Sequence, residues 1–260
     1  MMKIFFLTFG GPLQNYHDAV KRLCEQAKNM EIFHEIIGLT EKDLINDNEF
    51  WNKHSDFIKS NQRGYGYWLW KSYIIKKTLE QMNNNDILLY MDCGCELNHL
   101  ARDDLNNKIE IVKTKFILGS SACKEKDWNK INLINYLNMN EDRYLNTRQN
   151  AATIIMIYKN DLTTNIINEW YTICENYDLI NDSKSNIIEH RTFIEHRHDQ
   201  SVFSLLTKKY DCCNYDFDPV YASNFNDINL FKHNTINWPI WAARNKTGNS
   251  ILDNLIKIKK

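Results

Sequence analysis

An acidic residue follows a short apolar run near the middle of the chain, in residues 88–94 (LLYMDCG). A carboxylate at the end of a buried strand can hold a divalent cation, and a glycine two positions later lets a diphosphate approach the backbone closely. The same Asp-x-Gly pattern also forms ordinary turns, because Asp and Gly dominate turn positions. The segment therefore indicates either a phosphate and metal site at Asp92 and Gly94 or a plain turn.

Cations and aromatic rings are concentrated just upstream, in residues 63–71 (RGYGYWLWK). Arg63 and Lys71 carry charges that suit phosphate oxygens, and the partial positive charge at the start of the following helix adds to them. An aromatic face here can stack on a base or a sugar, whereas Trp68 and Trp70 can equally anchor the core. We expect contacts of Arg63 and Lys71 with phosphate oxygens, and we expect at least one of the two tryptophans to be a core residue.

Histidines meet an acidic residue in residues 195–201 (EHRHDQS), directly before an apolar helix. His-x-His followed by Asp can form a metal site, because imidazole and carboxylate suit zinc or manganese. Alternatively, Asp199 acts as a base or hydrogen-bond acceptor, and Gln200 places an amide near a reacting carbon. In the simplest alternative, Asp199 caps the helix and the histidines are solvated.

A zinc site elsewhere is a weaker hypothesis. It would draw on three histidines and two adjacent cysteines, but adjacent cysteines without a matching Cys-x-x-Cys pair are not a zinc-finger pattern. The residues concerned are His190, His196, His198, Cys212 and Cys213.

Two residues toward the end of the sequence are further candidates for metal or phosphate binding. His233 can complete a metal site, although by itself it is an ordinary loop histidine, and Arg244 can face a diphosphate.

Strand-like and helix-like patterns alternate along the chain. Continuous apolar runs predict strands at residues 4–9, 31–37, 87–91, 115–119 and 151–158. Helical spacing predicts helices at residues 19–27, 67–82, 162–171 and 199–209, and Thr40 with Asp43 predicts a cap for one more. This alternation predicts an α/β fold with a mainly parallel sheet, in which ligands bind beyond the carboxyl ends of the strands. The loop after residue 91 should face such a site, and we see no linker that divides residues 1–260.

Composition excludes several classes of protein. The chain has 260 residues, of which 43% are hydrophobic and 25% charged, so a sizeable core is expected and disorder is not. A formal charge of −1 provides no overall positive field for nucleic acid or an anionic membrane. No apolar run approaches the roughly 20 residues of a membrane span, and no signal-peptide cleavage site follows the opening strand. Seven irregularly spaced cysteines favour a reducing, cytoplasmic environment.

Taken together, three segments resemble nucleotide-sugar-dependent glycosyltransferases of the GT-A fold. They are residues 63–80 (RGYGYWLWKSYIIKKTLE), 87–94 (ILLYMDCG) and 196–206 (HRHDQSVFSLL). The match spans most of residues 3–245 and is most similar to uncharacterised bacterial and giant-virus members, so the expected location extends to a host cytoplasm. The resemblance implies one Rossmann-like domain with a mixed, mainly parallel sheet flanked by helices, its nucleotide-binding half over about 1–120 and its acceptor and catalytic half over about 121–260.

The resemblance also implies a reaction. A sugar would pass from a nucleotide diphosphate donor, in the first place a UDP-sugar, to a glycan or protein acceptor with the help of Mn²⁺ or Mg²⁺. Catalytic roles would fall to Asp199 and Gln200 and metal binding to Asp92 and His233. Donor-binding residues would be Thr8, Phe9, Gly10, Arg63, Lys71, Asp92, Gly94 and Arg244.

The chain departs from the family pattern where a second metal-binding Asp is usual. Gly94 stands there, followed by Cys95 and Glu96. Hard cations prefer oxygen, so Cys95 is a poor substitute, whereas Asp92, Glu96, a late histidine and the donor diphosphate can together assemble a site. We expect a weak metal site that forms fully only with donor bound. The alternative is an inactive GT-A-like module that binds a sugar nucleotide or glycan without turnover, and either stereochemical outcome of transfer stays open.

Overall fold

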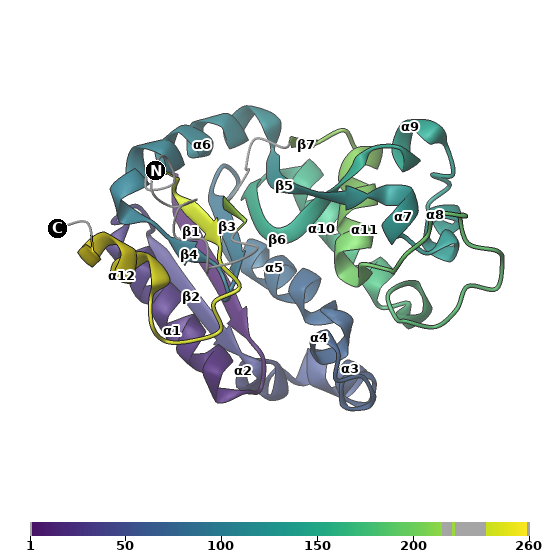
Figure 1. Ribbon diagram of the computed structural model, residues 1–260, viewed down its shortest axis with the longest axis horizontal. Coiled ribbons are helices and arrows are strands. Elements are labelled where there is room, and N and C mark those ends of the chain that lie inside the picture. The colour runs from purple at the N-terminus through teal and green to yellow at the C-terminus, as the bar shows by residue number, and fades with distance from the viewer. Residues whose placement is uncertain (1, 215–219, 222–237, 259–260) are drawn as a thin grey trace.

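A computed structural model describes residues 2–214, 220–221 and 238–258, and its centre is a six-stranded sheet (Figure 1). The strand order is β2-β1-β3-β6-β5-β7, and β6 alone runs antiparallel to its neighbours. The prediction of an α/β fold with a mixed, mainly parallel sheet is therefore confirmed. The strands are β1 (Ile4–Gly10), β2 (Glu35–Thr40), β3 (Ile87–Asp92), β5 (Ile117–Lys124), β6 (Arg148–Tyr158) and β7 (Cys213–Asn214).

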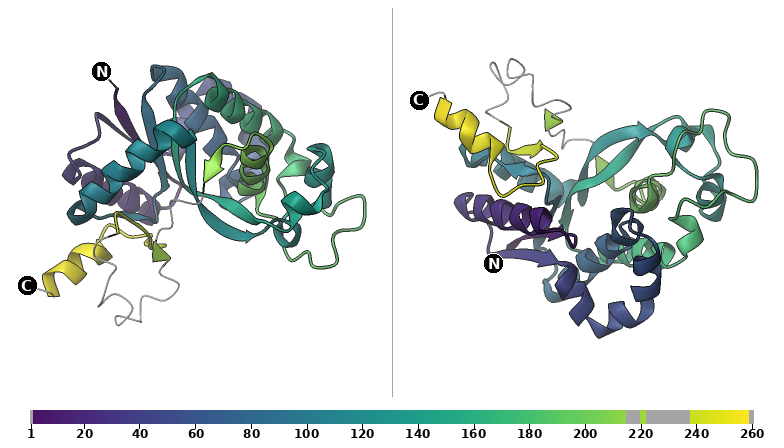
Figure 2. Two further views of the ribbon diagram at one scale, coloured as in Figure 1. Left: turned by 90° about the horizontal axis from the view of Figure 1, so that it is seen from above. Right: turned by 60° about the horizontal axis from the view of Figure 1, so that its bottom comes forward.

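Helices cover both faces of this sheet, as the views in Figure 2 show. One face is covered by α1 (Gln14–Asn29) and α6 (Arg102–Lys115), and the other by α5 (Leu69–Gln81), α10 (Asp161–Cys174) and α11 (His198–Lys209). Successive residues of a strand point to opposite faces. Phe5, Leu7 and Phe9 accordingly join one core cluster, while Ile4 and Phe6 join the other. Burial on both faces explains why β1 is a continuous apolar run.

A small second sheet closes the side of the molecule next to α1. Its strand order is β4-β9-β8, which brings the end of the chain back to the segment that follows β3. The C-terminal helix α12 lies beside α1 in Figure 1. The elements are β4 (Glu96–Leu97), β8 (Val220–Tyr221), β9 (Ile240–Ala242) and α12 (Ile251–Ile258).

Further helices, all but α3 short, make up most of the connections. They are α2 (Glu41–Asn46), α3 (Asn48–Ser60), α4 (Gly64–Tyr67), η1 (His99–Ala101), α7 (Glu125–Trp128), α8 (Ile131–Tyr136), α9 (Asp142–Leu145) and η2 (Tyr177–Leu179). The predicted cap is confirmed, since Thr40 and Asp43 form a reciprocal capping box at the start of α2. None of the helices in the described part of the chain is both long and apolar enough to cross a bilayer.

Two predicted strands are displaced. The strand predicted at residues 115–119 is β5, which spans Ile117–Lys124. The strand predicted at residues 31–37 is β2, which spans Glu35–Thr40. Glu31 has a positive φ of 54° immediately after α1, so the backbone turns there before it extends. The apolar residues Ile32 and Phe33 pack against the core from this connection, which is why the run looked like the beginning of the strand.

Candidate active site

The site lies at the carboxyl ends of two neighbouring parallel strands. Strands β1 and β3 are paired in register, and Phe9 stands opposite Asp92, the last residue of β3. Parallel strands present their carboxyl ends at one edge of the sheet, where open α/β sheets bind ligands. The structure thus puts Asp92 at the position expected from the sequence.

A buried lysine bridges two aspartates at this edge. Lys71 Nζ lies 3.1 Å from Asp92 Oδ1 and 3.5 Å from Asp199 Oδ2. The ammonium also donates a hydrogen bond of 3.0 Å to the carbonyl oxygen of Ala152, in β6. Helix α5, strand β3 and helix α11 each contribute one charged group, so residues far apart in the sequence form one cluster. Asp92 is 34% exposed, whereas Lys71 and Asp199 are each only 4% exposed.

Burial and neighbouring charges shift the pKa values of Asp199 and Lys71 in opposite directions. Burial raises the pKa of Asp199 to about 7, although the Lys71 ammonium opposes the rise. Burial alone would lower the pKa of Lys71, but Asp199 and Asp92 hold that pKa above its usual value. The Tyr90 hydroxyl donates to Asp92 Oδ1 at 2.7 Å, and burial holds the pKa of Tyr90 well above its usual range. The cluster thus contains a protonated lysine and a carboxyl group that titrates near neutrality.

Gln200 fixes α11 to the sheet instead of pointing freely into the site. Its amide nitrogen donates to Gln149 Oε1 at 2.8 Å, and its amide oxygen accepts from the backbone N–H of Ala152 at 3.3 Å. Helix α11 begins at His198 with Arg197 as the N-cap, so Asp199 is not the capping residue. The capping interpretation of Asp199 is therefore wrong, because its side chain turns toward Lys71.

The three residues at the end of β1 are buried. Phe9 stacks on Trp70 with ring centroids 4.0 Å apart, and Trp70 is 5% exposed, which confirms a core role for one tryptophan of the motif. Thr8 Oγ1 is buried with no hydrogen-bond partner in the described ranges of the chain. A Cβ at Gly10 would lie 2.8 Å from Tyr16 O, so this glycine allows close packing of α1. Contact of these residues with a nucleotide stays a prediction.

Arg63 is held by acidic residues of a later loop. Its guanidinium forms an ion pair of 3.1 Å with Asp182 and a second ion pair with Glu195, and the side chain is 41% exposed. These carboxylates differ from the two that hold Lys71. The predicted contacts of Arg63 and Lys71 with donor phosphates stay predictions.

Gly94 packs against the returning C-terminal segment. Its carbonyl oxygen accepts from the N–H of Asn245 at 2.8 Å, and a Cβ at Gly94 would lie 3.4 Å from Arg244 Cα. A Cβ at position 94 would therefore be in van der Waals contact with this backbone. Arg244 itself is exposed and has a positive φ of 51°, and its contact with a diphosphate stays a prediction.

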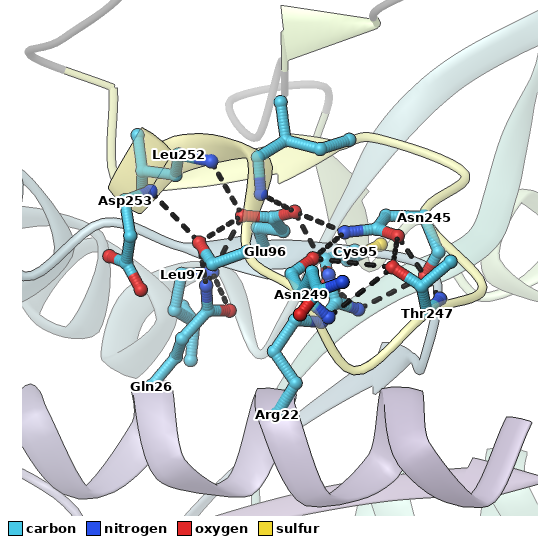
Figure 3. Close-up of polar contacts among 12 residues, drawn as sticks. Arg22, Gln26, Cys95, Glu96, Leu97, Asn245, Thr247, Asn249, Leu252 and Asp253 are labelled. Carbon is cyan, nitrogen blue, oxygen red and sulfur yellow. Dashed lines mark hydrogen bonds and ion pairs between the residues drawn. The ribbon is translucent and has the colours of Figure 1, made fainter. Parts of the chain in front are cut away.

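Glu96 is a structural residue (Figure 3). Its carboxylate is fully buried and accepts from Arg22 at 2.9 Å, from Asn245 Nδ2 at 2.7 Å and from Ser250 Oγ at 2.9 Å. The backbone N–H groups of Ile251 and Leu252 donate to it at 3.0 Å each, which ties down the start of α12. Both oxygens are occupied by protein donors, so the expectation that Glu96 could join a metal site is wrong.

Within the described residues, no group of three or more His, Cys, Asp or Glu side chains is arranged to hold a metal ion. The zinc hypothesis is therefore wrong. His196, one of its members, has both ring nitrogens within hydrogen-bond distance of backbone groups, Lys130 N and Leu179 O. His233, the second predicted metal ligand, lies outside the described residues. Of the pair Asp92 and His233, Asp92 is the residue that the structure describes, and a single carboxylate does not define a metal site.

A cavity of about 470 Å³ opens beside the loop that holds Arg63. Its lining combines carboxylates and hydroxyls with apolar side chains, including Asp182, Ser185, Ile187, Phe193 and Glu195. The volume falls within the range of roughly 300–1,000 Å³ that is usual for small-molecule pockets.

Sequence reasoning missed several supporting residues. In the sequence, Tyr90 is one residue of an apolar strand pattern, and neither Gln149 nor Ala152 carries any signal of a role. Their contacts join residues separated by 51 positions for Gln149 with Gln200 and 81 for Lys71 with Ala152. Spacing along the chain reports local neighbours only, so these partners were not predictable.

The fold and this cluster define an α/β protein with a charged site at the strand ends, and its chain path is similar to that of solved glycosyltransferases. A glycosyltransferase involved in the glycosylation of the major capsid of PBCV-1 has a TM-score of 0.48 and 9% identity, covering 99% of this chain and 98% of that one. The galactosyltransferase LgtC, in complex with donor and acceptor sugar analogs, has a TM-score of 0.44 and 13% identity, covering 93% of this chain and 86% of that one. Mouse xyloside xylosyltransferase 1 has a TM-score of 0.41 and 9% identity, covering 82% of this chain and 84% of that one.

All three of these neighbours are glycosyltransferases. At these identities and TM-scores, the likeness defines neither a reaction nor a substrate for this chain. No protein-family model and no curated protein sequence matches it.

Proposed function

We propose that this protein transfers a sugar from a nucleotide diphosphate donor, in the first place a UDP-sugar, to a glycan or protein acceptor. The observation that carries the proposal is the buried Lys71 between Asp92 and Asp199 at the carboxyl ends of β1 and β3. In this proposal the nucleotide lies over the half formed by about residues 1–120, and the acceptor lies against about residues 121–260.

Exposure assigns different roles to the two aspartates. Asp92 is one-third exposed and is the carboxylate that would meet the donor. Asp199 is buried behind it, so we favour a role in orienting the donor sugar over direct removal of a proton from a large acceptor. Lys71 keeps both carboxylates in place and balances their charge.

The cavity near Arg63 is the proposed acceptor site. Its carboxylates and hydroxyls can accept and donate hydrogen bonds with sugar hydroxyls, and Phe193 offers a ring for the apolar face of a sugar. This supports a glycan acceptor, which in the proposal would lie against the loop of residues 182–196.

Assistance by Mn²⁺ or Mg²⁺ is a part of the proposal for which the described residues supply one ligand, Asp92. Asp92 would supply one oxygen, and further ligands would have to come from the donor diphosphate and from His233. If bound, such an ion would offset negative charge on the leaving diphosphate. The other steps proposed here depend on Lys71, Asp92 and Asp199.

Thermal unfolding with nucleotides tests the proposal. UDP, GDP and their sugars, each with and without Mn²⁺, should raise the unfolding midpoint by roughly 5–10 °C when the matching nucleotide is present at about 100 times its Kd. Hydrolysis of the matching nucleotide sugar then tests turnover. A midpoint unchanged by every nucleotide would contradict the proposal.

The burial of Asp199 supports one alternative, a module that binds a sugar nucleotide or glycan without turnover. It predicts the same midpoint shift but no hydrolysis and no transfer. A shift that grows with Mn²⁺ and is followed by turnover would exclude it.

A further inference from the structure

Five consecutive residues at the start of the aromatic motif are left-handed. Residues 64–68 have φ angles of 59°, 53°, 83°, 52° and 59°. Tyr67 N donates to Arg63 O at 2.8 Å and Trp68 N donates to Gly64 O at 3.1 Å, the spacing of an α-helix but with the opposite hand. Three of the five residues carry aromatic side chains, for which this conformation is unfavourable. Such strain persists only where the surroundings impose it, and it is concentrated at functional sites.

Close packing holds this left-handed turn. A Cβ at Gly64 would lie 2.3 Å from the Trp68 ring, and a Cβ at Gly66 would lie 2.7 Å from Ile58 Cγ1. The Trp70 indole N–H donates to Gly64 O at 2.9 Å. The Trp68 ring therefore packs directly against Gly64. Both positions require glycine, because their φ angles are positive and a Cβ atom would clash with the neighbouring side chain.

The partner of the turn is a second left-handed residue. His198, the first residue of α11, has a φ of 54° and is buried. Its ring is stacked on Trp68 with centroids 5.4 Å apart and an interplanar angle of 24°, and it lies 4.9 Å from the ring of Tyr67. Its Nδ1 is 2.7 Å from Ile180 O, which fixes the ring in this orientation.

The stack joins the starts of the two helices that carry Lys71 and Asp199. Trp68 is the residue before α5, and Lys71 N donates to Trp68 O at 2.9 Å. Asp199 follows His198 directly. Lys71 is thus three positions from Trp68 in the sequence, and Asp199 is one position from His198.

We propose that Trp68 and His198 are a positioning pair that sets the start of α5 against the start of α11 and so keeps Lys71 at Asp199. Neither side chain has to touch a substrate. The catalytic consequence rests on the proposed function, whereas the structural coupling does not.

Amide hydrogen exchange tests the coupling without any assay of activity. His198→Asn removes the ring but keeps a residue that tolerates the left-handed conformation, and His198→Phe keeps a ring. We expect His198→Asn to raise exchange about tenfold at the starts of both α5 and α11. His198→Phe keeps the stacked ring but loses the contact of Nδ1 with Ile180 O, so we expect it to raise exchange clearly less than His198→Asn. Faster exchange at α11 alone would overturn the proposal.

A matched control comes from another stacked ring at a positive φ. Phe116 has a φ of 65° after α6, and its ring is stacked on Tyr158 at 6.5 Å. Phe116→Asn should speed exchange near α6 and leave the starts of α5 and α11 unchanged. Trp68→Asn removes the other ring of the pair and must reproduce the pattern of His198→Asn, so the test survives if one variant does not fold.

Transfer kinetics test the catalytic consequence. His198→Asn should lower kcat about tenfold or more with little change in the donor KM, and His198→Phe should restore most of kcat. A kcat unchanged in His198→Asn despite faster exchange would overturn the catalytic role. A wild-type protein without transfer would count against the proposed function, while hydrogen exchange would still decide the coupling.

Discussion

Lys71 Nζ lies 3.5 Å from Asp199 Oδ2 although the two residues are 128 positions apart (199 − 71), and only 4% of each side chain is exposed. Charges in such surroundings are costly unless they are paired, and removal of one partner leaves the other uncompensated. The stability of this protein and its proposed chemistry therefore depend on the same contact.

Replacement of the lysine should destabilise the fold in a pH-dependent way. Lys71→Met leaves two carboxylates without their cation, and at pH 8 we expect a loss of about 3–5 kcal/mol in the free energy of unfolding. At pH 5 the loss should be smaller, because Asp199, with a pKa of about 7, is protonated there. Urea unfolding at both pH values measures the difference.

Lys76→Met, which removes a partly exposed partner of Glu80, is the control and should lower the free energy of unfolding by less than about 1 kcal/mol. Equal losses at the two pH values would contradict the assigned ionisation of Asp199.

The pH dependence of Asp199→Asn has a definite sign. The pKa of Asp199 is raised in the folded protein from 3.8 to about 7, so between these values the folded state binds more protons than the unfolded state. Wild-type stability relative to Asp199→Asn should therefore fall as pH rises from about 4 to about 7, by at most about 4 kcal/mol, and level off above that range. Parallel denaturant titrations of the two proteins provide the comparison. A difference that does not vary with pH would show that the carboxyl group titrates normally.

Asp92→Asn should abolish transfer without unfolding the protein. Asp92 is the exposed carboxylate of the cluster, so its loss removes the group that would meet the donor while the buried pair of Lys71 and Asp199 remains. We expect kcat to fall by more than about 100-fold. The control is Tyr90→Phe, which removes only the hydroxyl that donates to Asp92 and should have an effect of roughly tenfold or less. An unchanged rate in Asp92→Asn would refute its role.

Glu96→Gln should destabilise the C-terminal segment and the loop after β3. The change leaves Arg22 buried without its ion pair and weakens the bonds to the start of α12, so we expect a loss of about 3–5 kcal/mol. Arg22 and hydrogen bonds hold the pKa of Glu96 below its usual value despite burial. Its contribution is therefore present above pH 4.5 and lost as pH falls through the lower folded value. Thermal unfolding measures the loss, and Glu110→Gln, at an exposed ion pair with Lys113, should change stability by less than about 1 kcal/mol. Similar losses of stability in Glu96→Gln and Glu110→Gln would argue against a structural role of Glu96 at the start of α12.

Local patterns predicted the elements that carry strong periodicity. The strand at residues 87–91 and the helix at residues 199–209 agree with β3 and α11 to within one residue at either end. Periodicity in the sequence predicted neither α3 nor α6. Helix α6 is largely polar, with Leu105, Ile109 and Val112 as its buried residues, so its apolar stripe is narrow. Helix α4 was not predictable, because runs of left-handed residues have no sequence rule beyond the presence of glycine.

The α/β class and the candidate residues Asp92, Lys71 and Asp199 were predictable from the amino-acid sequence, because alternating apolar patterns and the chemistry of side chains are local properties. Which of these residues meet was not predictable and is seen in the folded protein. Lys71 lies beside the carboxylates of Asp92 and Asp199. Arg63 instead forms an ion pair with Asp182, and Glu96 accepts a hydrogen bond from the start of the C-terminal helix. The physical reason is that the sheet brings distant segments to one edge, and the pKa of Asp199 depends on the burial and charges found there.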